Sequence, residues 1–170
     1  QETGASEWRL WRRRTSRRHI AAKLYLSVPP RDIEDAVSRV VPALYDSEAL
    51  AFKLAATRLD LLRADKFVLY FPSTSSMHDT ALVLDNRISE FAPHEVPFTC
   101  VLDGCARVTW GADPAKEDRS RLLPDECSWR TWICERAGAA IAEANSAGLT
   151  DEVALHFVLS RVASSGVDPT

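Results

Sequence analysis

The segment HIAAKLYLSV, residues 19–28, alternates between apolar and polar side chains with the period of two that a half-buried β-strand requires. Leu24 and Leu26 fall on one face of such a strand, whereas Lys23 and Tyr25 fall on the other. A strand with one apolar face has to pack that face against another layer. The segment therefore predicts a sheet that is covered on one side.

A helix and two more strands are predicted next along the chain. Residues 31–44 repeat apolar side chains at helical spacing and begin beside Asp32, a residue type that caps helices. LAFKLAA at 50–56 and KFVLYF at 66–71 have the composition of strands. The connection between them, TRLDLLRADKF, fits either a helical turn or an irregular excursion.

The second half of the chain combines loops, short strands and helices. STSSMHD at 73–79 is expected to be a mobile polar loop, and an amphipathic helix is expected over 79–92. Two short strands follow around an Asp-Gly turn at 103–104, and Ser128 and Thr150 are candidate N-caps of two final helices. The sequence thus predicts a single α+β domain with a mostly antiparallel sheet and helices packed on one face.

Composition limits the class of protein. The 170 residues, 46% of them hydrophobic, suffice for one domain, and a net charge of −3 argues against a general nucleic-acid binder. Cys100, Cys105, Cys127 and Cys134 form no CxxC pair and have no histidine at metal-ligand spacing, so no metal is expected. The chain has no glycine-rich phosphate loop or dinucleotide fingerprint, so no cofactor is expected. No signal peptide or membrane segment is visible, which predicts a cytoplasmic protein.

Residues 1–20 hold much of the arginine, in the run RLWRRRTSRRH from Arg9 to His19. This segment is expected to be a basic N-terminal arm or an edge strand, with Trp8 and Trp11 packed on the core in the second case. An arm of this charge can bind an acidic or phosphorylated partner, or it can simply be solvated.

Lysines in the middle of predicted strands need an explanation, because burying a charged amine is costly. Lys23 and Lys53 either point to solvent from half-exposed strands or converge on one anion, together with an arginine of the connection, Arg58 or Arg63. Lys66, the first residue of the segment KFVLYF, is expected to be exposed at the start of that strand. His94 is expected to lie in a polar loop.

These motifs resemble those of a known family. KLYLSVPPRDIEDAVSRVVPALYDSEALAFKLA followed by DKFVLYF resembles the core of the phosphothreonine lyase superfamily, in particular the lyase domains of lanthipeptide synthetases. ARVTWGADP and SWRTWICERAGAAI look more like the Hop-A type effector family. Members of that family also occur as stand-alone partners of a kinase in the biosynthesis of class V lanthipeptides and thioamide-containing peptides. The resemblance covers roughly residues 23–140 and implies a phospho-Ser/Thr lyase-like domain over 21–170.

The resemblance implies roles for individual residues. Lys53 matches the general base of such lyases, and Lys23 matches a phosphate-binding lysine. Arg58 or Arg63 lies where the family places an arginine, and Arg107 lies where a late strand supplies another phosphate-binding arginine. Phosphate elimination removes a weakly acidic α-proton, so it needs a neutral amine and cations that stabilise the leaving group. Surrounding cations and partial burial are what make a lysine neutral near pH 7.

The sequence departs from the family at Tyr25, where the effector lyases have the histidine that acts as general acid. Three explanations are open: Tyr25 donates the proton, arginines neutralise the phosphate without an acid, or the site has lost its chemistry. Trp129 with Arg130 is a candidate lining of a peptide groove, the alternative for a tryptophan being a packing role.

The sequence leaves three functions open. The leading hypothesis is a cytoplasmic lyase that converts phosphoserine or phosphothreonine of a precursor peptide into a dehydroamino acid, with a separate kinase supplying the phosphate. The second is a non-catalytic module that binds a phosphopeptide or leader peptide for that kinase. The third is a type III effector that acts on host phosphoproteins.

Overall fold

The computed structural model of the protein describes residues 8–13, 19–102, 105–112 and 128–165. The chain divides into two compact units, residues 1–112 and 113–170. The first unit contains all the described strands and two long helices, and the second contains a helical hairpin. The predicted α+β class, with an antiparallel sheet and helices on one face of it, is confirmed.

The sheet of the first unit has six strands in the order β1-β3-β4-β2-β6-β5. Every pair of neighbouring strands is antiparallel. The strands are β1 (Trp8–Arg12), β2 (Ala22–Leu26), β3 (Ala51–Ala55), β4 (Phe67–Phe71), β5 (Cys100–Leu102) and β6 (Cys105–Gly111). The segments expected to form strands around residues 19–28, 50–56 and 66–71 are therefore β2, β3 and β4.

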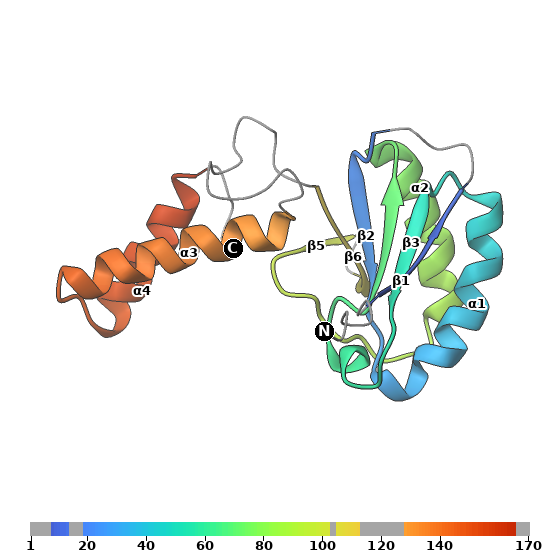
Figure 1. Ribbon diagram of the computed structural model, residues 1–170, viewed down its shortest axis with the longest axis horizontal. Coiled ribbons are helices and arrows are strands. Elements are labelled where there is room, and N and C mark those ends of the chain that lie inside the picture. Colours follow the sequence, from blue (N-terminus) through green and yellow to red (C-terminus); the bar gives the residue numbers. More distant parts are fainter. Residues whose placement is uncertain (1–7, 14–18, 103–104, 113–127, 166–170) are drawn as a thin grey trace, which may run out of the picture. The chain divides into compact units, whose positions relative to one another are not determined.

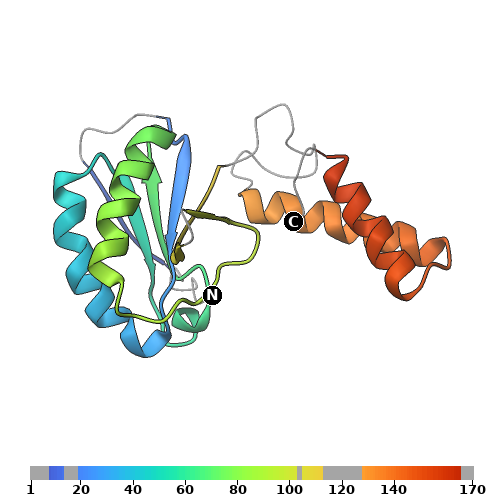
Figure 2. The same cartoon turned by 180° about the vertical axis from the view of Figure 1, so that it is seen from behind.

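Two helices pack side by side against one face of this sheet (Figures 1 and 2). They are α1 (Ile33–Asp46), which follows the 3₁₀ turn η1 (Pro30–Asp32), and α2 (Thr74–Ile88). The main core lies between helices and sheet, because Val40 and Leu84 are fully buried together with Leu24 and Leu69. The alternation of β2 therefore places its apolar side under the helices, as predicted.

The opposite face of the sheet, which we call the far face, carries the side chains that alternate with those of the core along each strand. In β2 these residues are Lys23 and Tyr25, and the register aligns them with Tyr70 and Val68 of β4. Lys53 of β3 also pairs with Val68, so it lies on the same side of the sheet. The far face is thus where the unusual charged residues of the strands gather.

One local prediction was wrong, and the structure refines three others. The polar segment 73–79 is not a loop: Ser73 caps α2 by accepting a hydrogen bond from the Ser76 amide at 3.1 Å, and the hydroxyl-rich residues form the first turns of that helix. Asp32 and Thr150 occupy cap positions without a side-chain cap hydrogen bond. The ambiguous connection before β4 contains a short 3₁₀ turn, η2 (Asp60–Leu62).

The basic N-terminal segment includes β1, which forms an edge of the sheet by pairing with β3. The ring of Trp11 stacks on Phe52 with centroids 4.8 Å apart. Arg13 donates hydrogen bonds to the carbonyl oxygens of Leu44 and Tyr45 at the last turn of α1, at 2.9 and 2.7 Å, where a cation is favoured. Residues 1–7 and 14–18 of the segment lie outside the described residues.

The second unit is built from α3 (Trp129–Ser146) and α4 (Asp151–Ala163), which pack against each other. The cap predicted at Ser128 is confirmed, since its hydroxyl accepts a hydrogen bond from the Thr131 amide at 3.2 Å. Arg161 and Glu143 form an ion pair between the two helices at 2.6 Å. None of the helices in the described ranges combines the length and the apolar character needed to cross a bilayer.

Candidate functional site on the far face of the sheet

The strand register brings three predicted site residues onto one surface. Lys53 of β3 and Tyr25 of β2 both pair with Val68 of the intervening β4. Because neighbouring strands lie about 4.8 Å apart, the Lys53 and Tyr25 backbones are separated by roughly 10 Å. Lys23 lies opposite Tyr70, and its Nζ lies 5.7 Å from the centroid of that ring. Side chains from these strands can therefore converge on one small ligand.

Trp8 of β1 links Lys53 to an arginine from a different part of the chain. Its indole ring has the Lys53 Nζ 3.9 Å from its centroid, and the Arg63 guanidinium carbon lies 5.2 Å from the same centroid. The negative face of an indole attracts cations, and Trp is the most effective aromatic side chain in this role. Two positive groups that would otherwise repel each other are thus held beside one ring.

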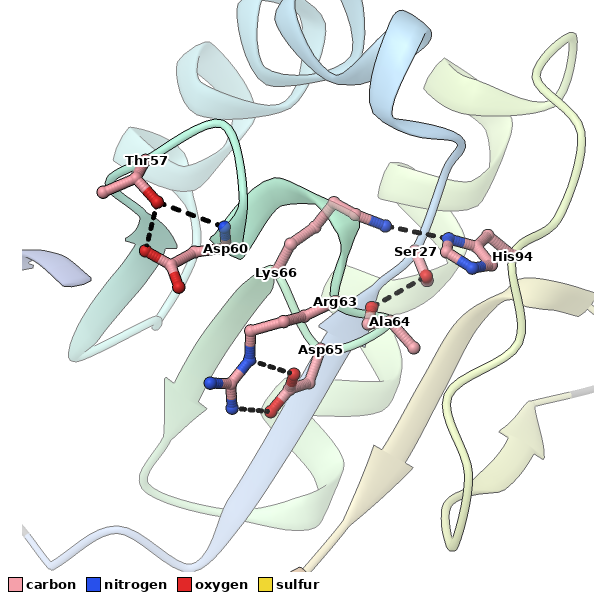
Figure 3. A network of polar contacts seen from close by, with 8 residues as sticks. All are labelled: Ser27, Thr57, Asp60, Arg63, Ala64, Asp65, Lys66 and His94. Atoms are coloured by element: carbon pink, nitrogen blue, oxygen red, sulfur yellow. Dashed lines mark hydrogen bonds and ion pairs between the residues drawn. The ribbon is translucent and has the colours of Figure 1, made fainter. Parts of the chain in front are cut away.

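A carboxylate fixes the orientation of Arg63. Arg63 Nε and Nη2 donate hydrogen bonds to the two oxygens of Asp65 at 3.0 and 3.3 Å, as Figure 3 shows. Because the guanidinium and the carboxylate are both planar, these two hydrogen bonds set the direction of the Arg63 guanidinium as well as its position. Asp65 itself is buried, whereas the Arg63 side chain is 42% exposed and accessible to a ligand. Arg58, the alternative candidate, lies exposed in the turn before η2.

Tyr25 is buried at the centre of the far face. Only 4% of it is exposed, and it packs with Val68 and Val96 in a small apolar cluster to which Ala64 contributes. Thr109 of β6 is the partner of Tyr25 on its other side, and its hydroxyl is buried without a hydrogen-bond partner in the described part of the chain. Such a hydroxyl costs free energy unless a ligand or water supplies a partner.

Lys66 is not exposed, contrary to the prediction. None of its surface is accessible, and its Nζ donates a hydrogen bond to the Val28 carbonyl at 3.0 Å. The same Nζ lies 2.9 Å from Nδ1 of His94, a residue from the segment that follows α2 (Figure 3). The prediction failed because the side chain of Lys66, just before β4, reaches the backbone carbonyl of Val28, two residues beyond the end of β2.

The pKa values of Lys66 and His94 are both shifted in the direction that removes charge. Burial lowers the pKa of Lys66 from 10.5 to about 8, against an opposing effect of the Asp65 carboxylate. Burial and then the positive charge of Lys66 lower the pKa of His94 below 6.5, and a hydrogen bond to the Val28 backbone opposes them. His94 is therefore neutral at pH 7 and accepts through Nδ1 from the ammonium of Lys66.

Other predicted site residues are engaged elsewhere. Arg107 of β6 has its Nε 3.6 Å from Oδ1 of Asp85 on α2, and its Nη1 donates a 3.4 Å hydrogen bond to the Phe91 carbonyl. Its role as a phosphate ligand stays a prediction. Trp129 and Arg130 belong to the second unit, where the Trp129 ring stacks on Trp132 with centroids 5.1 Å apart. Their role in peptide binding also stays a prediction.

Sequence reasoning missed three residues of this region: Trp8, Lys66 and His94. The sequence around Lys66 does not indicate that His94 is its partner, because the two residues are 28 positions apart. Trp8 was considered as a core anchor, but its pairing with cations depends on the register of β1 beside β3. Within the described ranges, no group of three or more His, Cys, Asp or Glu residues is arranged to hold a metal ion.

No protein-family model and no curated protein matches the sequence at a significant level. Solved structures do match in fold. OspF, a type III effector and phosphothreonine lyase from Shigella flexneri, is 17% identical with a TM-score of 0.54, over 65% of this chain and 66% of its own. The VirA (SpvC) phosphothreonine lyase effector of Chromobacterium violaceum is 18% identical with a TM-score of 0.54, over 76% and 74%.

A further match extends over nearly the whole chain. An effector protein from Pseudomonas syringae pv. tomato is 12% identical with a TM-score of 0.61, and the match covers 99% of this chain and 63% of the effector. At such low identities the likeness concerns the fold. The chain therefore has a fold similar to that of phosphothreonine lyase effectors, with Lys23, Tyr25, Lys53 and Arg63 gathered around the far face of its sheet.

Proposed function

We propose that the far face eliminates phosphate from phosphothreonine or phosphoserine in a peptide and leaves a dehydroamino acid. The observation that carries the proposal is the gathering of Lys53 and Arg63 at the Trp8 ring, beside the strand that holds Lys23 and Tyr25. The phosphothreonine lyases with the same fold support the choice of reaction.

Lys53 is assigned as the general base. Its neutral amine takes the α-proton of the phosphorylated residue, and the electron pair of that C–H bond forms the double bond between Cα and Cβ. The Cβ–O bond breaks, and its electrons leave with the phosphate. The Lys53 ammonium on the Trp8 ring has to release its proton before it acts as the base. The Arg63 guanidinium beside the same ring favours that release, because it disfavours a second positive charge nearby.

Arg63 and Lys23 are assigned to the phosphate. Arg63 offers a planar fork whose direction Asp65 fixes, and Lys23 offers a point charge from the neighbouring region of the far face. Charge builds up on the phosphate as the Cβ–O bond breaks, so cations placed there stabilise the transition state more than the substrate. No metal or organic cofactor takes part in these steps.

Tyr25 is assigned as the donor of a proton to the departing oxygen. It occupies the strand position where the family resemblance expects a histidine, and it lies across Val68 from the base. Tyr25→Phe keeps the ring packed on Val68 and Val96 and removes only the hydroxyl. A fall in the elimination rate without loss of phosphopeptide binding supports the assignment. An unchanged rate assigns the neutralisation of the phosphate to the cations alone.

The proposed setting is the cytoplasmic modification of a ribosomally made precursor peptide, with a partner kinase that supplies the phosphate. Lanthipeptide-type products contain the dehydroamino acids that this reaction forms. Trp129 and Arg130 remain candidates for binding the peptide, and Arg107 remains a candidate for binding phosphate.

The decisive experiment is mass spectrometry of a synthetic phosphothreonine peptide incubated with the purified chain. Loss of phosphoric acid, together with an alkene that a thiol can trap, is the expected result. Lys53→Ala should lower the rate by at least about 100-fold. Intact phosphopeptide after incubation with the chain alone, and again with the kinase present, would falsify the lyase.

Two other functions each have an observation in their favour. Burial of Tyr25 at the acid position favours a binding module that holds a phosphopeptide without reacting, and tight binding of an unchanged phosphopeptide would identify it. The solved relatives named as effectors favour an effector that acts on phosphoproteins. Elimination from a folded phosphoprotein, but not from precursor peptides, would identify that function.

A further inference from the structure

Two loops meet over the far face at the end of β2. Residues 63–66 carry Arg63 and lead into β4, and residues 94–96 follow α2. Ala64 from the first loop and Val96 from the second both pack in the cluster that buries Tyr25. The loops therefore form the wall of the proposed site, although they are some thirty residues apart along the chain.

Short polar contacts join the two loops to each other and to the end of β2. The Ser27 hydroxyl donates to the Ala64 carbonyl at 2.8 Å, and the His94 amide donates to the Ser27 carbonyl at 3.2 Å. The Lys66 Nζ donates to the Val28 carbonyl and contacts His94 Nδ1, at 3.0 and 2.9 Å. Figure 3 shows the Lys66 side chain directed toward His94, while Arg63 and Asp65 extend the other way.

We propose that Lys66 and His94 form a clamp that fixes the Arg63 loop against the Val96 loop and so positions the Arg63 guanidinium for the phosphate. The inference rests on the proposed function for its catalytic meaning, but the clamp itself is a property of the two loops. Lys66 and His94 are positioning residues: the first is wholly buried, and both act through Arg63.

The buried position of Lys66 makes its contacts matter. A buried amine with no acceptor is costly, so the lysine needs both the Val28 carbonyl and the His94 ring. His94 accepts through Nδ1 only while it is neutral, because a protonated imidazole has no free acceptor and repels the ammonium. Among the described residues, the Asp65 carboxylate, held by Arg63, acts on Lys66, and the exposed Glu95 is the neighbour of His94 in the chain.

A pair of His94 variants tests the clamp. His94→Asn keeps an acceptor near the position of Nδ1 and cannot be protonated, whereas His94→Leu removes the acceptor. His78→Asn, an exposed histidine of α2, is the matched control. The readout is hydrogen exchange of the amides in residues 63–66 and 94–96, corrected for intrinsic exchange. Protection should fall about tenfold in His94→Leu, while Asn and the control should match the parent.

The second readout links the clamp to the site. With the phosphothreonine peptide, His94→Leu should raise KM about tenfold and change kcat much less, because Arg63 is displaced while Lys53 is not. His94→Asn should restore the parent KM. Below pH 6.5, the parent KM should rise as His94 is protonated, and the Asn variant should not follow it.

The outcomes separate the clamp from the proposed reaction. If the parent eliminates no phosphate, the same variants are compared by their Kd for the phosphopeptide, and failure of the reaction leaves the exchange result standing. Lys66→Met, which keeps the apolar stem, provides an independent removal of the clamp. The proposal is overturned if His94→Leu and Lys66→Met both keep the two loops as protected as the parent, or if the loops open while KM and Kd stay constant.

Discussion

Lys53 and Arg63 lie against one indole ring, that of Trp8, with their charged groups 3.9 and 5.2 Å from its centroid. The three residues come from β3, from the connection before β4 and from the edge strand β1. An aromatic face lowers the cost of bringing two cations together, because each is attracted to the same negative quadrupole. Trp8 thus assembles the part of the site that no single strand carries.

Trp8→Phe and Trp8→Leu should therefore differ. Phenylalanine keeps an aromatic face at the ring position, and we expect kcat/KM within a few-fold of the parent; leucine keeps only apolar bulk, and we expect a loss of about tenfold. The measurement is the initial rate of phosphate release from the phosphothreonine peptide. Equal rates for the two variants would show that the ring serves only to pack β1 against β3.

Arg63 and Arg58 are equivalent candidates by sequence but not by position. Arg63 is oriented by Asp65 and shares the Trp8 ring with Lys53, whereas Arg58 lies exposed in a turn. Arg63→Ala should raise KM by about tenfold or more, since hydrogen bonds to charged groups are among the strong ones. Arg58→Ala should leave KM within about threefold of the parent. A larger rise in KM for Arg58→Ala than for Arg63→Ala would show that the phosphate binds at the turn that contains Arg58.

Thr109→Val tests whether a bound ligand supplies the hydrogen-bond partner that the buried Thr109 hydroxyl next to Tyr25 lacks among the described residues. Valine has nearly the shape of threonine, so the variant removes a hydroxyl that has no partner in the described part of the chain. The free energy of unfolding should rise by about 1 kcal/mol. Affinity for the phosphopeptide should fall if the ligand supplies the missing partner. A lower melting temperature in the variant would mean that the hydroxyl is already satisfied.

The strands and most helices could be predicted from the sequence because their patterns are local. The alternation around Lys23 and the apolar spacing after Asp32 each follow from one segment's own residues. The start of α2 could not, because serine-rich sequence favours loops and N-caps alike, and here Ser73 caps a helix that begins at Thr74.

Only the site residues that lie within strands could be placed from the sequence. Lys23, Tyr25 and Lys53 follow from alternation within strands, and the structure places all three on the far face. The role of Lys66 depends on His94, and that contact joins loops that no local pattern connects. The charge of Lys66 led to the prediction that it is exposed. The sequence does not show that the Val28 carbonyl accepts a hydrogen bond from it and so lowers the cost of its burial.

The stability of the protein should depend on pH through Lys66 and His94 in two separate windows. Both groups have lower pKa values in the folded protein than in the unfolded chain, so the unfolded chain binds more protons between the two values of each group. For His94, stability is lost as the pH falls below 6.5 through the lowered pKa. For Lys66, stability rises as the pH increases from about 8 to 10.5.

Thermal unfolding measured between pH 5 and 10 separates these two contributions. We expect the melting temperature of the parent to fall on acidification below pH 6.5, and His94→Asn to remove part of that fall because the amide does not titrate in this range. Lys66→Met should flatten the rise above pH 8 without changing the acidic window in the same way. Profiles of all three proteins that run parallel across both windows would show that neither group titrates differently on folding, and the buried contact would then have no electrostatic consequence.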